Sequence, residues 1–309
     1  MLDFRIDTFL VVCRYMNFTK AASELHITQP AVSHHIHYLE KEYGVRLFEY
    51  NGKKVNLTEA GKVFLSAAIT MKDDEQHLKK IMEQQSGKGG RLVFGATMTI
   101  GEYVMPEALT RFLHVYPGTA VQMVVGDTRE LLGKLNDGEI EFALVEGFFQ
   151  KKEYDFLVFA TEPFAAVCAP DYKFCRKTVK VEDLLGERLF IREPGSGTRY
   201  VFERYLEGKN LLLHDFPNLM EISNIGAMKQ MVAKGQGITF LYEAAVKEEL
   251  DRGVLKRIEL EDFQLTHDFT FIWRKGSIYK SYYKEMFDIL HGTKAENDIF
   301  HPSFCESRE

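Results

Sequence analysis

The sequence predicts an α/β protein in two parts: a small helical domain that ends in a hairpin and a long helix, then a larger domain of alternating strands and helices. Three observations predict it. Residues 17–39 have the pattern of two short helices joined by a tight turn. Ser86–Gly90 is a glycine-rich hinge. From Arg91 onward, apolar runs of strand length alternate with helical patterns, as in doubly wound sheets. The length of 309 residues suits two domains.

The second helix of the pair is predicted to have one buried face and one polar face. Val32, Ile36 and Leu39 recur at the spacing i, i+4, i+7, which places them on one side. Thr28 can cap this helix, and Pro30 lies in its first turn, where a missing N–H costs nothing. A helix of this kind suits insertion into a DNA major groove. The side chains that point away from the buried face are Gln29, Ser33, His34 and His37.

A β-hairpin is predicted directly after the helix pair. Asn51-Gly52 lies between two short apolar runs, which is a strong hairpin signal. A hairpin in this position is a wing, and Lys53 and Lys54 at its tip can contact DNA phosphates. Solubility is the alternative role for two exposed lysines.

The long helix begins after Thr58, which can cap it. Its apolar residues follow spacings of three, four or seven and form a heptad seam that is interrupted at Asp74. We interpret it as a dimerisation helix; the alternative is a helix packed on its own domain. The seam consists of Ala60, Phe64, Ala67, Met71, Leu78 and Ile81.

Five strings within the first 61 residues together resemble the N-terminal domain of LysR-type transcriptional regulators. They are Phe18-Thr19-Lys20-Ala21-Ala22, Gln29-Pro30-Ala31-Val32-Ser33, Leu39-Glu40, Gly44-Val45-Arg46-Leu47-Phe48 and Leu57-Thr58-Glu59-Ala60-Gly61. Their order and spacing make a chance match improbable. The remaining length also fits, so the resemblance covers nearly the whole chain.

The resemblance implies a winged helix-turn-helix and a long linker helix, followed by a two-lobed, periplasmic-binding-protein-like α/β effector domain. The implied limits are 1–58 for the DNA-binding domain, 59–90 for the linker helix and hinge, and 91–309 for the regulatory domain. Lobe I would comprise 91–161 and 268–292, and lobe II 162–267. The expected DNA contacts are Thr19, Gln29, Pro30, Ser33, His34, His37, Lys53 and Lys54.

Strands of the larger domain are expected at 91–96, 120–125, 141–145, 157–160, 165–169, 188–191, 219–222, 238–241, 254–258 and 269–273. Helices are expected at 101–116, perturbed by Pro106, and at 128–135, 198–207, 225–234, 244–250 and 279–290. The polar tail after His291 is expected to be poorly ordered.

A ligand site is expected where strands end and helices begin, because open α/β sheets bind ligands at that edge. Hydroxyls and helix dipoles there favour a small anion, although Glu146 would repel one and instead suits an amine or solvent. Helix capping is the ordinary reason for Ser, Thr and Asn at such positions. The effector contacts that we expect are Thr97, Met98, Thr99, Thr128, Glu146, Gly195, Ser196, Thr198 and Asn224.

Charge alone does not predict DNA binding, since the net charge is −6. Residues 1–90 carry 12 basic and 11 acidic side chains, whereas residues 91–309 carry 27 and 34. The N-terminal part is therefore less acidic than the rest of the chain, but it is not strongly basic.

Four of the ten histidines lie within twelve residues, at His26, His34, His35 and His37. Zinc binding is possible at these spacings, but no Cys or carboxylate completes a set, so DNA contact is favoured. LysR-type proteins usually carry Arg or Gln at several of these positions and a basic residue where Tyr50 stands, so the preferred operator should differ. If His34 and His37 meet phosphates as imidazolium, DNA affinity should fall as pH rises from about 6 to 8.

The sequence contains no catalytic signature, so we expect no enzyme activity and no cofactor. The four cysteines form no Cys-x-x-Cys motif and are expected to be reduced, with a Cys168–Cys175 redox pair as the alternative. Without a signal peptide or membrane-length apolar run, a cytoplasmic protein is expected. The predicted partners are double-stranded DNA, a small effector and a second copy or three further copies of the chain. Two contrasting hypotheses are a two-lobed carrier or enzyme with the helix-turn-helix as an interaction module, and a metal-sensing repressor.

Overall fold

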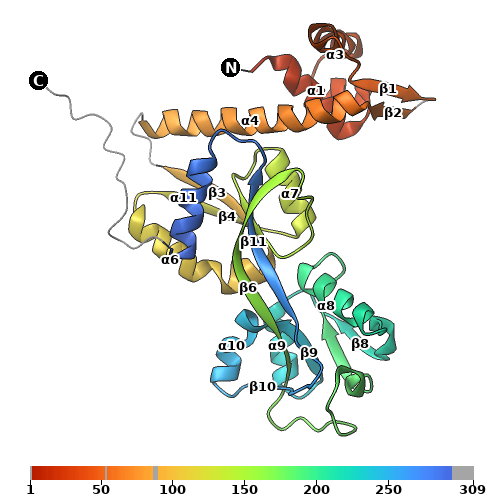
Figure 1. Ribbon diagram of the computed structural model, residues 1–309, viewed down its shortest axis with the longest axis vertical. Coiled ribbons are helices and arrows are strands. Elements are labelled where there is room, and N and C mark those ends of the chain that lie inside the picture. Colours follow the sequence, from red (N-terminus) through yellow and green to blue (C-terminus); the bar gives the residue numbers. More distant parts are fainter. Residues whose placement is uncertain (1, 53, 86–89, 294–309) are drawn as a thin grey trace, which may run out of the picture.

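The computed structural model describes residues 2–52, 54–85 and 90–293. Its N-terminal domain is a helix-turn-helix with a wing (Figure 1). The elements are α1 (Phe4–Tyr15), α2 (Phe18–Glu24), α3 (Gln29–Tyr43), β1 (Phe48–Asn51) and β2 (Lys54–Leu57). Lys53 and residues 86–89 of the predicted hinge lie outside the described residues, as does the chain from residue 294 onward.

Local signals delimit α3 as expected. The Thr28 hydroxyl accepts a hydrogen bond from the amide of Ala31, and Gly44 ends the helix at φ 67°, a left-handed conformation that favours glycine. Val32, Ile36 and Leu39 are buried in one apolar cluster with residues of α1, α2 and β1. This packing fixes α3 and leaves its other face to solvent.

The long helix α4 (Glu59–Gln85) extends from the wing and lies along one side of the C-terminal domain (Figure 1). The predicted seam is partly wrong. Phe64 belongs to the core of the N-terminal domain, where its ring contacts Phe9 at 4.9 Å between centroids. Ala67, Met71 and Leu78 remain exposed. Another face of α4 packs on the C-terminal domain of its own chain, through residues such as Thr70 and Asp73, as the alternative interpretation expected. The dimerisation role of the helix stays a prediction.

The C-terminal domain, from Arg91 onward, has two lobes (Figure 1). Lobe I contains β3 (Arg91–Ala96), α5 (Met98–Tyr103), α6 (Met105–Val115), β4 (Ala120–Val125), α7 (Thr128–Asn136), β5 (Ala143–Val145) and α11 (Lys280–His291). Lobe II contains η1 (Val181–Leu184), β7 (Arg188–Ile191), α8 (Gly197–Gly208), η2 (Leu213–Asp215), β8 (Asn218–Glu221), α9 (Ile225–Ala233), β9 (Ile238–Tyr242), α10 (Glu243–Asp251) and β10 (Lys256–Arg257).

Two long antiparallel strands, β6 (Tyr154–Cys168) and β11 (Thr266–Arg274), run side by side through both lobes (Figure 1). The strand order is β4-β3-β5-β11-β6-β9-β7-β8. Pairing is parallel among β4, β3 and β5 and among β8, β7 and β9, and antiparallel where β6 and β11 take part. The predicted separate strands at 157–160 and 165–169 are wrong, because they form one strand. The predicted helix at 101–116 is two helices, which meet at Val104.

The two lobes pack closely on one side. Met98 and Tyr103 of lobe I lie against the apolar cluster of lobe II that includes Phe190 and Ile225. The Lys229 ammonium, from α9, lies 4.6 Å from the centre of the Tyr103 ring. In the part of the chain that the structure describes, no helix is both long and apolar enough to cross a bilayer.

Candidate DNA-binding surface and interlobe site

The face of α3 opposite its buried side carries the predicted DNA contacts. Gln29, Pro30, His34 and His37 are exposed, and Ser33 is half-buried. The Gln29 amide Nε2 donates to Ser33 Oγ at 2.9 Å. The two side chains therefore form one polar unit whose remaining donors and acceptors are free to contact base edges. Two further predicted contacts, Thr19 on α2 and Lys54 on β2, are exposed as well.

The histidines do not act as one group. His35 Nδ1 lies 3.0 Å from Thr8 Oγ1, and its ring packs edge-on against Phe4. Burial lowers the pKa of His35, so this residue is a neutral packing partner between α1 and α3. Among the described residues, no group of three or more His, Cys, Asp or Glu side chains is arranged to hold a metal ion.

A buried polar cluster joins the lobes. Glu146, which is 2% exposed, follows β5 of lobe I and accepts a hydrogen bond from the Thr198 hydroxyl at 3.2 Å. Thr198 is in the first turn of α8 in lobe II, and its Oγ1 lies 3.2 Å from Thr99 Oγ1 of lobe I. The backbone oxygen of Glu146 is 2.7 Å from Nε2 of His267, at the start of β11. Four elements therefore meet around Glu146.

Arg192 supplies the positive charge of this cluster, although no pattern in the sequence predicts its role. The residue directly follows β7 and is 3% exposed. Its Nε and Nη2 atoms donate to both carboxylate oxygens of Glu193, at 2.9 and 2.8 Å. Its charge lowers the pKa of Glu146, but burial outweighs this and raises that pKa to about 7.

Several buried polar atoms around this cluster have no hydrogen-bond partner among the described residues. Buried polar groups are nearly always paired, so such a concentration indicates a place for polar ligand atoms or water. The atoms are Thr97 Oγ1, Thr128 Oγ1, Glu146 Oε2, Arg192 Nη1, Ser196 Oγ and Tyr242 OH.

A cleft of about 1060 Å³ opens beside the cluster, between the two lobes. Of the predicted effector contacts, Thr128, Gly195 and Ser196 line it. Arg129 also lines it, is exposed, and has no ion-pair partner in the described part of the chain. A second, more apolar hollow of about 780 Å³ adjoins it across Phe148, which is 75% exposed.

The other predicted contacts lie elsewhere. Thr97, Thr99, Glu146 and Thr198 are buried beside the cleft and do not line it. Met98 packs against lobe II. Asn224 is exposed and its side chain accepts from the amide of Ala227, so it caps α9. The structure therefore brings most of the predicted residues to one region but gives Asn224 a capping role.

Close packing also restricts the backbone of this region. A Cβ atom on Gly197 would lie 2.4 Å from Cγ of Glu146. Any side chain at this position would therefore separate the start of α8 from Glu146 and hold the lobes apart. Glycine at position 197 allows the close contact.

We expect Glu146 to make the protein less stable as pH rises. Its pKa is 4.5 when unperturbed and about 7 in the folded protein, so between these values the unfolded chain loses a proton that the folded chain keeps. The free energy of unfolding should therefore fall across this range, by an amount on the order of 3 kcal/mol. Urea unfolding at pH 5 and pH 8 measures it. Glu146→Gln should remove this component, whereas Glu203→Gln, at a half-buried position that lines the same cleft, should not. Equal pH dependence in wild type and Glu146→Gln would contradict the assignment.

Comparison with known proteins agrees with this arrangement. The family model described as "Bacterial regulatory helix-turn-helix protein, lysR family" matches residues 5–62, and "LysR substrate binding domain" matches residues 85–294. The HTH-type transcriptional activator CmpR of Synechocystis is 31% identical over 274 residues, which are 88% of this chain and 89% of that protein.

Two solved structures have the same fold. Full-length LysG from Corynebacterium glutamicum, with bound effector Arg, aligns with a TM-score of 0.63 at 18% identity and covers 94% of this chain and 98% of that one. The regulatory domain of CcmR from Synechocystis, in complex with 2-PG, aligns with a TM-score of 0.57 at 20% identity and covers 67% of this chain and 98% of that one.

Proposed function

The chain belongs to the LysR family of effector-modulated, DNA-binding transcriptional regulators, and on this premise we propose that a small anion bound between its lobes controls its binding to an operator. The observation that carries the proposal is the buried interlobe cluster, in which Arg192 Nη1 and several hydroxyls have no partner among the described residues. Arg129 adds a second cation at the mouth of the cleft. The 2-PG complex of the CcmR regulatory domain and the effector Arg bound to LysG support a small-molecule effector for a protein of this fold.

Glu146 is compatible with an anion because its raised pKa keeps a fraction of the carboxyl group protonated near neutral pH. A protonated carboxyl group can donate a hydrogen bond to a ligand oxygen, whereas an ionised one would repel it. The effector contacts that we propose are the side chains of Thr128 and Ser196, which line the cleft, and of Arg192, which is buried beside it, with Arg129 at the entrance. The domain limits given by the resemblance, at residues 58, 90, 161 and 267, are part of the same proposal.

We propose that the regulator is a homodimer or homotetramer that works in the cytoplasm, where its DNA lies, and that it catalyses no reaction. The exposed face of α4 supports self-association, because its apolar residues recur every four or seven positions and suit pairing with a second helix. They are Val63, Ala67, Met71, Leu78 and Met82.

Thermal unfolding of the full-length protein against a panel of phosphorylated acids, carboxylic acids, amines and neutral sugars tests the effector class. A ligand that binds only the folded state raises the melting temperature. We expect at least one phosphorylated or carboxylic acid to do so, and no neutral sugar. A rise with amines alone would contradict an anionic effector and would assign Glu146 to a cation.

Lys54 should contribute to DNA affinity through phosphate contact alone. Lys54→Gln is expected to weaken operator and random DNA equally and to reduce the slope of log affinity against log salt by about 0.9 per phosphate lost. DNA titrations at several KCl concentrations measure the slope. Lys177→Gln, at an exposed position in lobe II, is the control and should leave it unchanged. A loss confined to the operator would assign Lys54 to base contact instead.

A further inference from the structure

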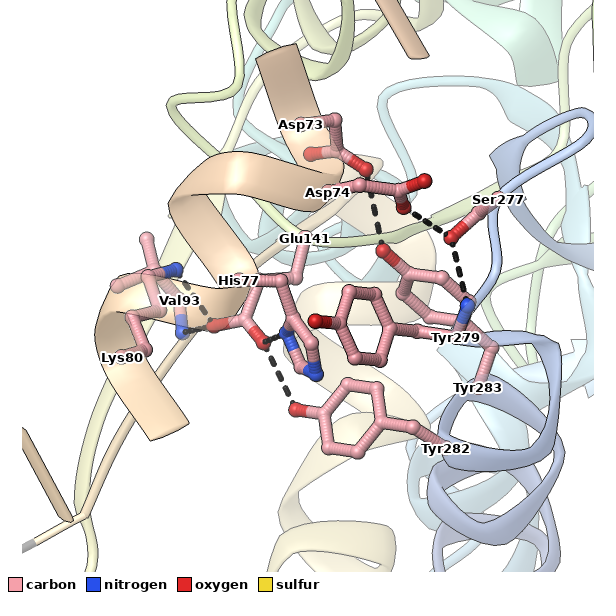
Figure 2. A network of polar contacts seen from close by, with 10 residues as sticks. All are labelled: Asp73, Asp74, His77, Lys80, Val93, Glu141, Ser277, Tyr279, Tyr282 and Tyr283. Atoms are coloured by element: carbon pink, nitrogen blue, oxygen red, sulfur yellow. Dashed lines mark hydrogen bonds and ion pairs between the residues drawn. The ribbon is translucent and has the colours of Figure 1, made fainter. Parts of the chain in front are cut away.

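The linker helix α4 is held on lobe I by a polar junction, shown in Figure 2. Tyr283 OH donates to Asp73 Oδ2 at 3.1 Å, and Ser277 Oγ donates to Asp74 Oδ1 at 2.5 Å. His77 is 6% exposed. The centroid of its ring lies 4.3 Å from the ring centroid of Tyr279 and 4.3 Å from that of Tyr282. The contact between α4 and lobe I is thus made by charged and hydrogen-bonded groups. The core of a permanent interface is, in contrast, mainly apolar.

Glu141 is the centre of this junction and is 4% exposed. Its carboxylate accepts from Lys80 Nζ at 2.9 Å, from Tyr282 OH at 2.7 Å and from the amide of Val93 at 3.1 Å, and His77 Nδ1 lies 3.7 Å away. Burial alone would raise the pKa of Glu141, but these partners lower it to about 2. It is therefore a buried, ionised carboxylate, and two of its partners, His77 and Lys80, come from α4.

The same short segment reaches the interlobe cluster. Glu141 precedes β5 and Glu146 follows it, so the two buried carboxyl groups lie at opposite ends of one three-residue strand. A shift of β5 along its axis would move both.

The neighbouring strand, β11, provides a second connection between the interlobe cluster and α4. β11 pairs with β5, and at its start His267 contacts the backbone oxygen of Glu146. At its end, the backbone oxygen of Lys275 accepts from Thr70 of α4 at 3.1 Å, and Ser277 holds Asp74. Two adjacent hydrogen-bonded strands therefore span the distance from the interlobe cluster to the linker helix.

We propose that the Glu141 junction is the joint through which the interlobe site repositions α4, with Lys80 and His77 as positioning residues and β5 and β11 as the rigid connection. The proposal deepens the regulation of the interlobe site and rests on the proposed function for its biological meaning. Moving α4 away would strip the buried Glu141 carboxylate of two partners, which is unfavourable. A change that shifts β5 therefore alters how tightly α4 is held.

Hydrogen exchange in the full-length protein tests the joint without knowledge of the effector. Glu146→Gln changes one end of β5, and the readout is the exchange rate of amides 70–82 of α4. We expect Glu146→Gln to change those rates at least fivefold, although Glu146 does not contact α4. In a Lys80→Met background this response should disappear, whereas in Lys79→Met it should remain. Lys79 is the matched control because it is adjacent on α4 and pairs only with Glu75 of the same helix among the described residues.

Tyr282→Phe provides a second test that does not depend on the folding of Lys80→Met. It removes one hydroxyl donor to Glu141, conserves the packing volume, and should reduce the response to Glu146→Gln. The proposal is overturned if Glu146→Gln leaves the exchange of α4 unchanged, or if the response survives in both Lys80→Met and Tyr282→Phe. Neither result depends on DNA or ligand binding, so the proposed function would stand or fall separately, on the melting-temperature panel and on specific DNA binding.

Discussion

Replacing Gln29 and Ser33 together by alanine should weaken operator binding by about 30-fold to 25,000-fold, because the pair is expected to make one good base contact of about 1–3 kcal/mol and a dimer presents two copies of α3. The two side chains are hydrogen-bonded to each other on the open face of α3. They carry no charge, so binding to random DNA, which depends on phosphates, should change little.

Fluorescence anisotropy with operator and random duplexes measures this difference at one fixed salt concentration. Gln236→Ala, an exposed substitution in lobe II, should change neither affinity and serves as the control. If the double variant lost operator and random binding to the same extent, Gln29 and Ser33 would contribute to folding or to phosphate contact, and α3 would not read bases through them.

Arg192→Leu should abolish most of the response to the anion. A hydrogen bond to a charged group contributes about 1.5–3 kcal/mol, so the affinity should fall roughly 10- to 150-fold. Arg192 is suited to bind an anion because it is a buried cation whose Nη1 atom has no partner among the described residues. Its Nε and Nη2 atoms donate to Glu193. Removing it also leaves Glu146 without the charge that lowers its pKa, so Glu146 should become more fully protonated.

Isothermal titration with the acid that raises the melting temperature most gives the affinity directly. Arg188→Leu is the matched control, because Arg188 begins the same strand, is exposed, and donates only to the backbone oxygen of Gln236 among the described residues. If Arg192→Leu left the affinity unchanged and Arg129→Leu reduced it, the anion would bind at the mouth of the cleft and not in the buried cluster.

The local elements were predictable because each has its own signal. Thr28, Pro30 and Gly44 delimit α3, and its buried residues recur at helical spacing. β6 was divided at Glu162 and Pro163 because a charge and a proline break the apolar pattern of a strand. In the structure, β11 pairs along the whole of this stretch, so tertiary pairing overrides the local break.

The candidate site was only partly predictable. The turns after the strands drew attention to Thr99, Glu146 and Thr198, whose hydroxyl and carboxyl groups meet between the lobes. Arg192 gave no such signal, because an arginine after a short apolar strand normally points to solvent. Its burial depends on partners that the local pattern does not identify. The polar face of α4 was likewise concealed, since Asp74 appeared only as an interruption of the seam.

The most direct measurement is a gel shift of the full-length protein on DNA from immediately upstream of its own gene, with increasing random DNA as competitor. We expect a discrete complex that survives an excess of random DNA and is displaced by the unlabelled fragment. A complex that random DNA displaces as readily as the fragment itself, or no complex at all, would contradict sequence-specific DNA binding on that fragment.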